Sequence, residues 1–199
     1  MPNAFIPRDQ VHAWSEAIGD NPEEHQAALT RLLKNQRRLT RFIEENAENL
    51  DGWTAGVSTY LTGVIVRIFD LAGGRLRSAT WAQIREAEAK VGAAVGGLMP
   101  LDETMPERAR NGDRAQPHVL DEALMALFHR FTKEDREEED GELDPTEAVK
   151  TYLMLWVVTE VLDANWKPGN GFEGESDYTY VHIEPKDRDA EGGDESDED

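Results

Sequence analysis

The 199-residue chain contains no cysteine, which excludes disulfide bonds, thiol catalysis and zinc sites with cysteine ligands. Long hydrophobic runs are also missing, because the apolar stretch 152–158 falls far short of the about 20 residues that a membrane span requires. The opening residues, MPNAFIPRDQ, lack the charged segment and apolar segment of a signal peptide. We therefore expect a cytoplasmic protein with no membrane segment.

Basic residues are scarce. The chain has 21 lysines and arginines against 41 aspartates and glutamates, and its formal net charge is -20. A polyanion is repelled by nucleic acid and by anionic membranes. No stretch combines basic residues with aromatic residues that could stack on bases. The composition predicts neither a nucleic-acid partner nor a membrane partner, whereas a protein partner fits it.

Motifs of well-known catalytic and cofactor sites are absent as well. The sequence has no HExxH motif, no paired ExxH motifs of di-iron bundles, no glycine-rich phosphate loop and no GxSxG nucleophile elbow. We therefore predict no cofactor and no resident metal. Catalytic residues cannot be assigned from motifs.

Helical periodicity is the main signal that the sequence does contain. Apolar residues recur at helical spacing, and capping residues or glycines bound most of the periodic segments. The predicted helices cover residues 21–50, 53–72, 80–98, 118–131 and 145–165, after a short helical turn at 11–18. Together they predict an all-α protein, a single bundle of about five helices in a domain of residues 1–166.

The segment 145–165 is predicted to be the centre of this bundle. Residues 152–158 carry no charge on any side of two helical turns, and a helix that is apolar all round is buried. The segment 53–72 is its expected companion, because it is uncharged from Trp53 to Val66. The predicted core aromatic residues are Trp156, Tyr152, Phe69 and Tyr60.

The composition changes after Trp166. A cluster of proline, glycine and asparagine follows, and nine acidic residues against two basic ones lie from Glu184 onward. We predict that residues 167–199 form an acidic, largely disordered tail. Alternation at 178–183 suggests either a short strand or an extended segment laid over the bundle.

Five cations in a chain this acidic form a candidate partner-binding site. They lie close together in the first long predicted helix, and they are Arg31, Lys34, Arg37, Arg38 and Arg41. One hypothesis is a partner site with Phe42 beside it as an aromatic anchor. The alternatives are a solvated face, in which Arg41 pairs with Glu44 or Glu45, and a face screened by the acidic tail.

Two further groups of polar residues are candidates for chemistry. His118, Glu122 and His129 share one helix face and have side chains that bind zinc or iron, but that face is predicted to point to water. Glu160 and Asp163 lie in the last turns of the central helix. They fit either a buried acid–base pair or the point where that helix emerges into solvent, and we expect the second.

Three functional hypotheses remain from the sequence. The first is a helical interaction or regulatory protein without catalytic activity. The second is an enzyme whose site is built from scattered carboxylates and histidines in the bundle, with or without a metal. The third is a mimic of nucleic acid, which the clustering of acids in loops and the tail disfavours.

Overall fold

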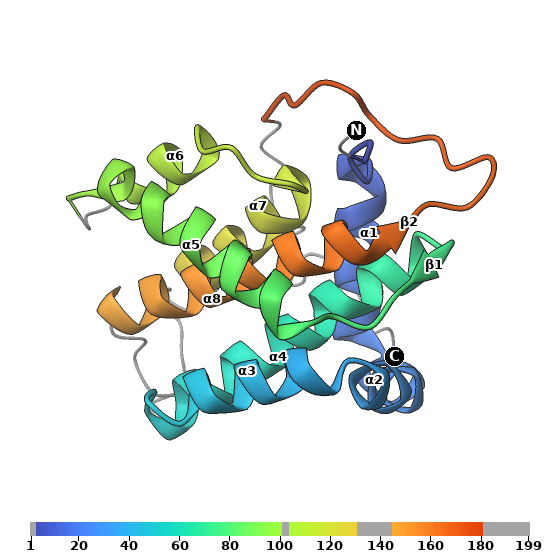
Figure 1. The fold of residues 1–199 in the computed structure, drawn as a ribbon, viewed down its shortest axis with the longest axis horizontal. Coiled ribbons are helices and arrows are strands. Elements are labelled where there is room, and N and C mark those ends of the chain that lie inside the picture. The colour runs from blue at the N-terminus through green and yellow to red at the C-terminus, as the bar shows by residue number, and fades with distance from the viewer. Residues whose placement is uncertain (1–2, 101–103, 131–144, 181–199) are drawn as a thin grey trace, which may run out of the picture.

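The computed structural model describes residues 3–100, 104–130 and 145–180, which contain eight α-helices and one π-helical segment (Figure 1). The helices are α1 (Arg8–Asp20), α2 (Pro22–Asn35), α3 (Arg37–Ala47), α4 (Gly52–Leu71), α5 (Trp81–Leu98), α6 (Met105–Arg110), α7 (Pro117–Met125), the π-helix η1 (Ala126–Arg130) and α8 (Pro145–Asn165). Within these residues the strands β1 (Arg75–Leu76) and β2 (Trp166–Lys167) have two residues each, so the all-α prediction is confirmed.

The predicted number of about five helices is too low. One reason is Gln36, which leaves the helical conformation at φ -107° and ψ 41° and divides the predicted helix 21–50 into α2 and α3. Its buried side-chain amide donates to the carbonyl of Arg77 at 2.9 Å and accepts from the backbone nitrogen of Ala79 at 3.0 Å. These bonds pair two backbone groups of the loop that precedes α5. The short helix α6 lies in the predicted connection 99–117.

Helix α8 occupies the centre of the bundle, as predicted. It passes through the middle of Figure 1 and contacts α3, α4, α5 and α7. Tyr152, Trp156 and Val158 are fully buried, as are residues on the other sides of the helix. Helices pack around the uncharged stretch, which explains why it is apolar on every side.

Helix α4 is the second central helix, and one of its predicted core residues lies elsewhere. Phe69 is buried, but the side chain of Tyr60 is 44 % exposed, so its prediction as a core residue is wrong. Gly63, on the other side of α4, faces α2, where a Cβ would lie 3.4 Å from Leu29. A small residue therefore lies at the contact between α2 and α4.

A two-residue ladder joins the ends of α4 and α8. Strands β1 and β2 pair antiparallel, with Leu76 opposite Trp166. The chain turns into β1 at Gly74, whose φ of 84° favours glycine and whose Cβ would lie 2.3 Å from the carbonyl of Lys167. The indole of Trp166 donates to the carbonyl of Gly73 at 2.7 Å. The two central helices are thus tied at one end.

The chain beyond β2 continues to contact the helices up to residue 180. Figure 1 shows this segment arching over the molecule, and Glu175 pairs with Phe5 through two backbone hydrogen bonds of 2.8 and 2.9 Å. Residues 178–180 form no strand, and their extended course over the bundle is one of the two predicted alternatives. Residues 181–183 and the acidic run from Glu184 lie outside the described residues.

None of the helices in the described residues combines the length and the apolar character that crossing a membrane requires. This finding agrees with the low hydropathy of the sequence.

Candidate functional site

A cavity of about 700 Å³ lies beside the end of α8. Segments far apart in the sequence line it: residues 3–5, Lys90 of α5, residues 113–115, Glu160 and Asp163 of α8, and residues 175–176. Its size falls within the range of small-molecule sites, about 300–1,000 Å³. Charged groups converge on it, so it is the candidate functional site.

Glu160 is held in the cavity wall by three donors. Its Oε1 accepts from the indole nitrogen of Trp156 at 3.0 Å and from the backbone nitrogen of Ala115 at 3.1 Å. Its Oε2 accepts from the ammonium of Lys90 at 2.9 Å, and Lys90 also lies 3.5 Å from Asp113. Both oxygens of Glu160 are therefore satisfied, and the residue ties α5, α8 and the loop before α7 together.

Asp163 lies one turn further along α8 and has fewer donors. Its Oδ1 accepts from the side-chain amide of Gln116 at 2.7 Å and lies 3.3 Å from the amide of Asn3. Within the described residues no donor contacts Oδ2, although Asp163 is only 9 % exposed. Asp163 is thus mostly buried, and its Oδ2 is reached by the solvent of the cavity instead of a protein donor.

The environment of Asp163 disfavours its charged form. Burial raises the pKa of this carboxyl above its ordinary value, because desolvation penalises the carboxylate, and the charge of Glu160 acts in the same direction. The hydrogen bonds from Gln116 and Asn3 and the charge of Lys90 partly oppose this rise in pKa. Raised carboxyl pKa values in cavities are typical of functional sites.

The predicted emergence of α8 into solvent at Glu160 and Asp163 is wrong. Both side chains are covered, because residues 3–6 and the loop 113–116 pack across the last turns of the helix. Gln116 fastens these two segments to each other: its Oε1 accepts from the backbone nitrogen of Ile6 at 2.8 Å, and its amide donates to the carbonyl of Ala4 at 3.2 Å.

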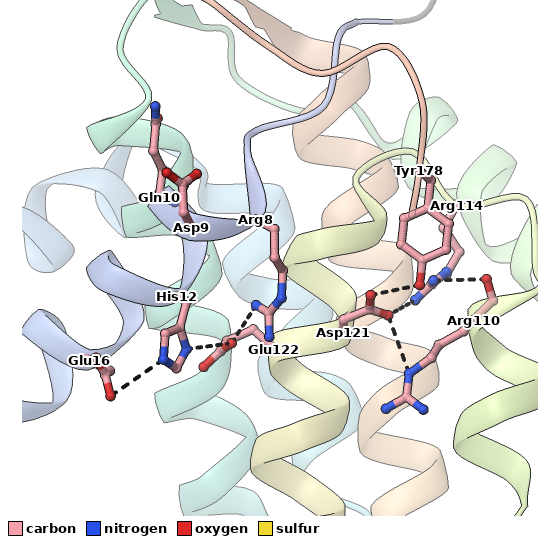
Figure 2. A network of polar contacts seen from close by, with 10 residues as sticks. All are labelled: Arg8, Asp9, Gln10, His12, Glu16, Arg110, Arg114, Asp121, Glu122 and Tyr178. Atoms are coloured by element: carbon pink, nitrogen blue, oxygen red, sulfur yellow. Dashed lines mark hydrogen bonds and ion pairs between the residues drawn. The ribbon is translucent and has the colours of Figure 1, made fainter. Parts of the chain in front are cut away.

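Two buried carboxylates of α7, Asp121 and Glu122, hold in place segments that line the cavity. Figure 2 shows that the consecutive residues Asp121 and Glu122 point to opposite sides of the helix. Asp121 accepts from the guanidinium of Arg114 and from the hydroxyl of Tyr178, both at 2.8 Å, so that both of its oxygens have donors (Figure 2). Arg114 also donates to the carbonyl of Arg110 at 3.0 Å. This network fixes the loop 110–114 and the segment 175–180.

Glu122 joins α7 to α1. Its Oε2 accepts from the guanidinium of Arg8 at 2.8 Å and lies 3.3 Å from Nδ1 of His12 (Figure 2). Nε2 of His12 lies 3.6 Å from Glu16 on the same helix. The buried Glu122–Arg8 pair therefore positions α1 and, through it, residues 3–6 at the cavity.

The proposed metal face of His118, Glu122 and His129 is not exposed as expected. His118 and Glu122 are buried, because α1 and the segment 172–180 cover that side of α7. Nε2 of His118 lies 2.7 Å from Glu175, whereas Glu122 faces Arg8. The side chain of His129 lies outside the described residues, and within them no three potential ligands gather closely enough to hold a metal ion.

The five basic residues are all exposed, but they lie on two helices instead of one. Arg31 lies 3.9 Å from Asp70, and Arg41 donates to Glu45 at 2.7 Å, which is the pairing that the sequence suggested. The neighbouring Phe42 is buried, so its predicted role as an exposed anchor is wrong. The surface formed by Arg31, Lys34, Arg37, Arg38 and Arg41 is called the basic face below.

Several residues of the cavity escaped the sequence prediction. Asn3, Lys90 and Gln116 belong to no motif, and the α8 carboxylates that they contact, Glu160 and Asp163, lie more than 45 positions away. One signal was available: Asp121 and Glu122 are two acids inside an apolar helical pattern, which indicates buried and paired charges.

Comparison with protein families, curated proteins and solved structures found no match for this chain.

Proposed function

We propose that this protein is a helical binding protein without catalytic activity, which takes a small polar ligand into the cavity beside α8. The observation that supports the proposal is Asp163: a buried carboxylate lines a cavity of about 700 Å³, and its Oδ2 has no donor within the described residues. Burial of the rest of Asp163 already disfavours its charge, and a ligand donor can take the place of the solvent that reaches Oδ2.

The other charged groups around the cavity support binding more than catalysis. Lys90 and Glu160 pair with each other, and Arg114 pairs with Asp121, so these groups hold the walls in place. Walls that are fixed in advance lose less conformational entropy when a ligand binds.

The test is an NMR titration of the ¹⁵N-labelled protein with a mixed panel of small amines, carboxylates, sugars and nucleosides at millimolar concentration. We expect at least one compound to shift the amide signals of residues 3–6, 113–116 and 160–164 together. The amides of α2 and α3 serve as the internal control, since they lie away from the cavity. A panel that leaves all cavity amides unmoved would contradict the proposal.

An enzymatic function is the alternative, and the raised pKa of Asp163 favours it. A carboxyl with such a pKa beside Lys90 is suited to general acid–base catalysis. The alternative predicts turnover of a bound compound from the panel, followed by mass spectrometry. That turnover should be lost in Asp163→Asn and kept in Lys34→Gln, a change on the basic face.

The basic face supports a second interaction. Its five exposed cations are complementary in charge to an acidic segment of another protein. A cytoplasmic location fits this proposal and the absence of cysteine. Poly-L-glutamate should bind the wild-type protein in low salt, and it should not bind a variant in which all five residues are glutamine. Equal binding by both proteins would exclude the basic face as the site.

A further inference from the structure

The hydrogens of the two side-chain amides near Asp163 are almost fully used elsewhere. A side-chain amide carries two N–H hydrogens. The amide nitrogen of Asn3 lies 2.9 Å from the carbonyl of Asp163 and 3.0 Å from that of Trp166, and both distances are shorter than its 3.3 Å contact with the carboxylate. Asn3 therefore binds the end of the α8 backbone, and Gln116 alone donates strongly to the carboxylate of Asp163.

No cation of the described residues contacts this carboxylate. The ammonium of Lys90 is taken by Glu160 and Asp113, and the guanidinium of Arg114 by Asp121. Glu160, three residues earlier on the same helix, has donors on both oxygens. The two carboxylates in this wall of the cavity therefore differ. Both oxygens of Glu160 accept hydrogen bonds, whereas Oδ2 of Asp163 accepts none from the described residues.

The open oxygen indicates the chemistry of the ligand. A cation supplies both the missing hydrogen bond and the missing charge, and charge-assisted hydrogen bonds are about twice as strong as neutral ones. A guanidinium binds best with two donors to two free oxygens, but Oδ1 already accepts from Gln116. A primary ammonium needs only a single oxygen. Asp113 and Glu175 add negative charge around the same cavity.

We propose that the ligand of the cavity carries a primary ammonium group, which donates to Oδ2 of Asp163. This inference rests on the proposed binding function and names the chemical class of the ligand. The ammonium donates to the free oxygen of Asp163 in the way that Lys90 donates to Oε2 of Glu160. Carboxylate ligands are repelled by the same wall.

The test uses four compounds with the same four-carbon chain: n-butylamine, n-butylguanidine, 1-butanol and butyrate. Binding to the full chain is followed at pH 7.5 by calorimetry and by the carboxyl ¹³C signal of Asp163. We expect n-butylamine to bind more tightly than the other three and to shift that signal. The signal is measured in the wild-type protein, so this readout does not depend on the folding of any variant.

Two variants assign the binding to Asp163. Asp163→Asn keeps the shape of the side chain and an acceptor for Gln116, and it should weaken n-butylamine by about tenfold or more, as expected for the loss of a charge-assisted hydrogen bond. Asp113→Asn is the matched control: it removes the same charge from the same cavity, but that carboxylate is 96 % exposed, so we expect a change of about twofold or less.

The outcomes separate the two proposals. If 1-butanol or butyrate binds as tightly as n-butylamine, the ammonium class is wrong, although the cavity still binds ligands. If Asp163→Asn and Asp113→Asn weaken the binding of n-butylamine equally, general electrostatic attraction explains the binding and the specific contact with Asp163 is wrong. If no member of the series and no compound of the mixed panel moves a cavity amide, the binding function itself fails.

Discussion

Replacing Trp156 by alanine tests both the centre of the bundle and the wall of the cavity. Trp156 is 1 % exposed, and its ring centroid lies 6.0 Å from that of Tyr152. Removing a buried tryptophan side chain costs about 3–5 kcal/mol of unfolding free energy. Losing the indole donor adds about 1 kcal/mol, because Oε1 of Glu160 keeps the bond from Ala115.

That loss is a large part of the about 5–15 kcal/mol by which domains of this kind are stable. Trp156→Ala should therefore lower the urea midpoint sharply while leaving the m value unchanged. Trp156→Phe is the control: it keeps most of the ring and lacks the indole donor, so we expect about 1–3 kcal/mol. A cost below about 1 kcal/mol for Trp156→Ala would refute the central position of α8.

A substitution at Gly112 gives a second test of the packing around Trp156. A Cβ at this position would lie 2.9 Å from Cη2 of Trp156, so Gly112→Ala should destabilise the wild-type protein by about 1–3 kcal/mol. In the Trp156→Ala background the added methyl enters the vacated space, and its cost should fall. A double-mutant cycle measures this coupling by urea unfolding. Additive costs would show that the two residues do not touch.

Three further predictions concern the ladder, the α7 network and the cavity. Gly74→Ala should destabilise more than Gly73→Ala, since both positions have positive φ but only the Cβ at Gly74 meets the backbone of β2. Asp121→Asn should cost about 3–5 kcal/mol, because it leaves the buried guanidinium of Arg114 uncompensated. Asp163→Asn should stabilise the ligand-free protein increasingly as pH rises from about 3.8 through the raised pKa of Asp163.

Urea unfolding measures all three. The sign for Asp163 follows from linkage: a carboxyl with a raised pKa in the folded state destabilises that state once it is ionised, and this cost disappears below the unfolded pKa. A stability difference that is constant with pH would contradict the raised pKa. Equal costs at Gly73 and Gly74 would contradict the close contact with β2, and a cost below about 1 kcal/mol for Asp121→Asn would contradict the buried pair.

Local patterns predicted the helices because helices form from local interactions. A capping box of Thr80 and Gln83, a local sequence pattern, starts α5, and the uncharged stretch 152–158 is buried as expected. The failures have non-local causes. Gln36 fits a helical stripe, but its amide bonds to a loop about 40 residues away, and this contact divides the helix.

The candidate site was only partly predictable for the same reason. Glu160 and Asp163 stand out in the sequence because they interrupt an apolar helix. Whether they face water or a cavity depends on residues 3–6 and 113–116, which pack across them from distant parts of the chain. No periodicity within α8 carries that information. The basic face was predicted from spacing within the single helix 21–50, which the structure divides into α2 and α3, and its role as a partner site stays a prediction.

The position of Asp163 within α8 gives a further physical reason to expect a bound cation. The helix ends at Asn165, so the partial negative charge of its C-terminus lies next to this carboxylate and disfavours its ionised form. Burial and the charge of Glu160 act in the same sense. Glu160 lies farther from the helix end and is offset by Lys90, whereas Asp163 has one strong amide donor. An ammonium group beside Asp163 would oppose all three effects at once. A neutral ligand such as 1-butanol supplies a hydrogen bond but no charge, which is why the comparison of n-butylamine with 1-butanol is decisive.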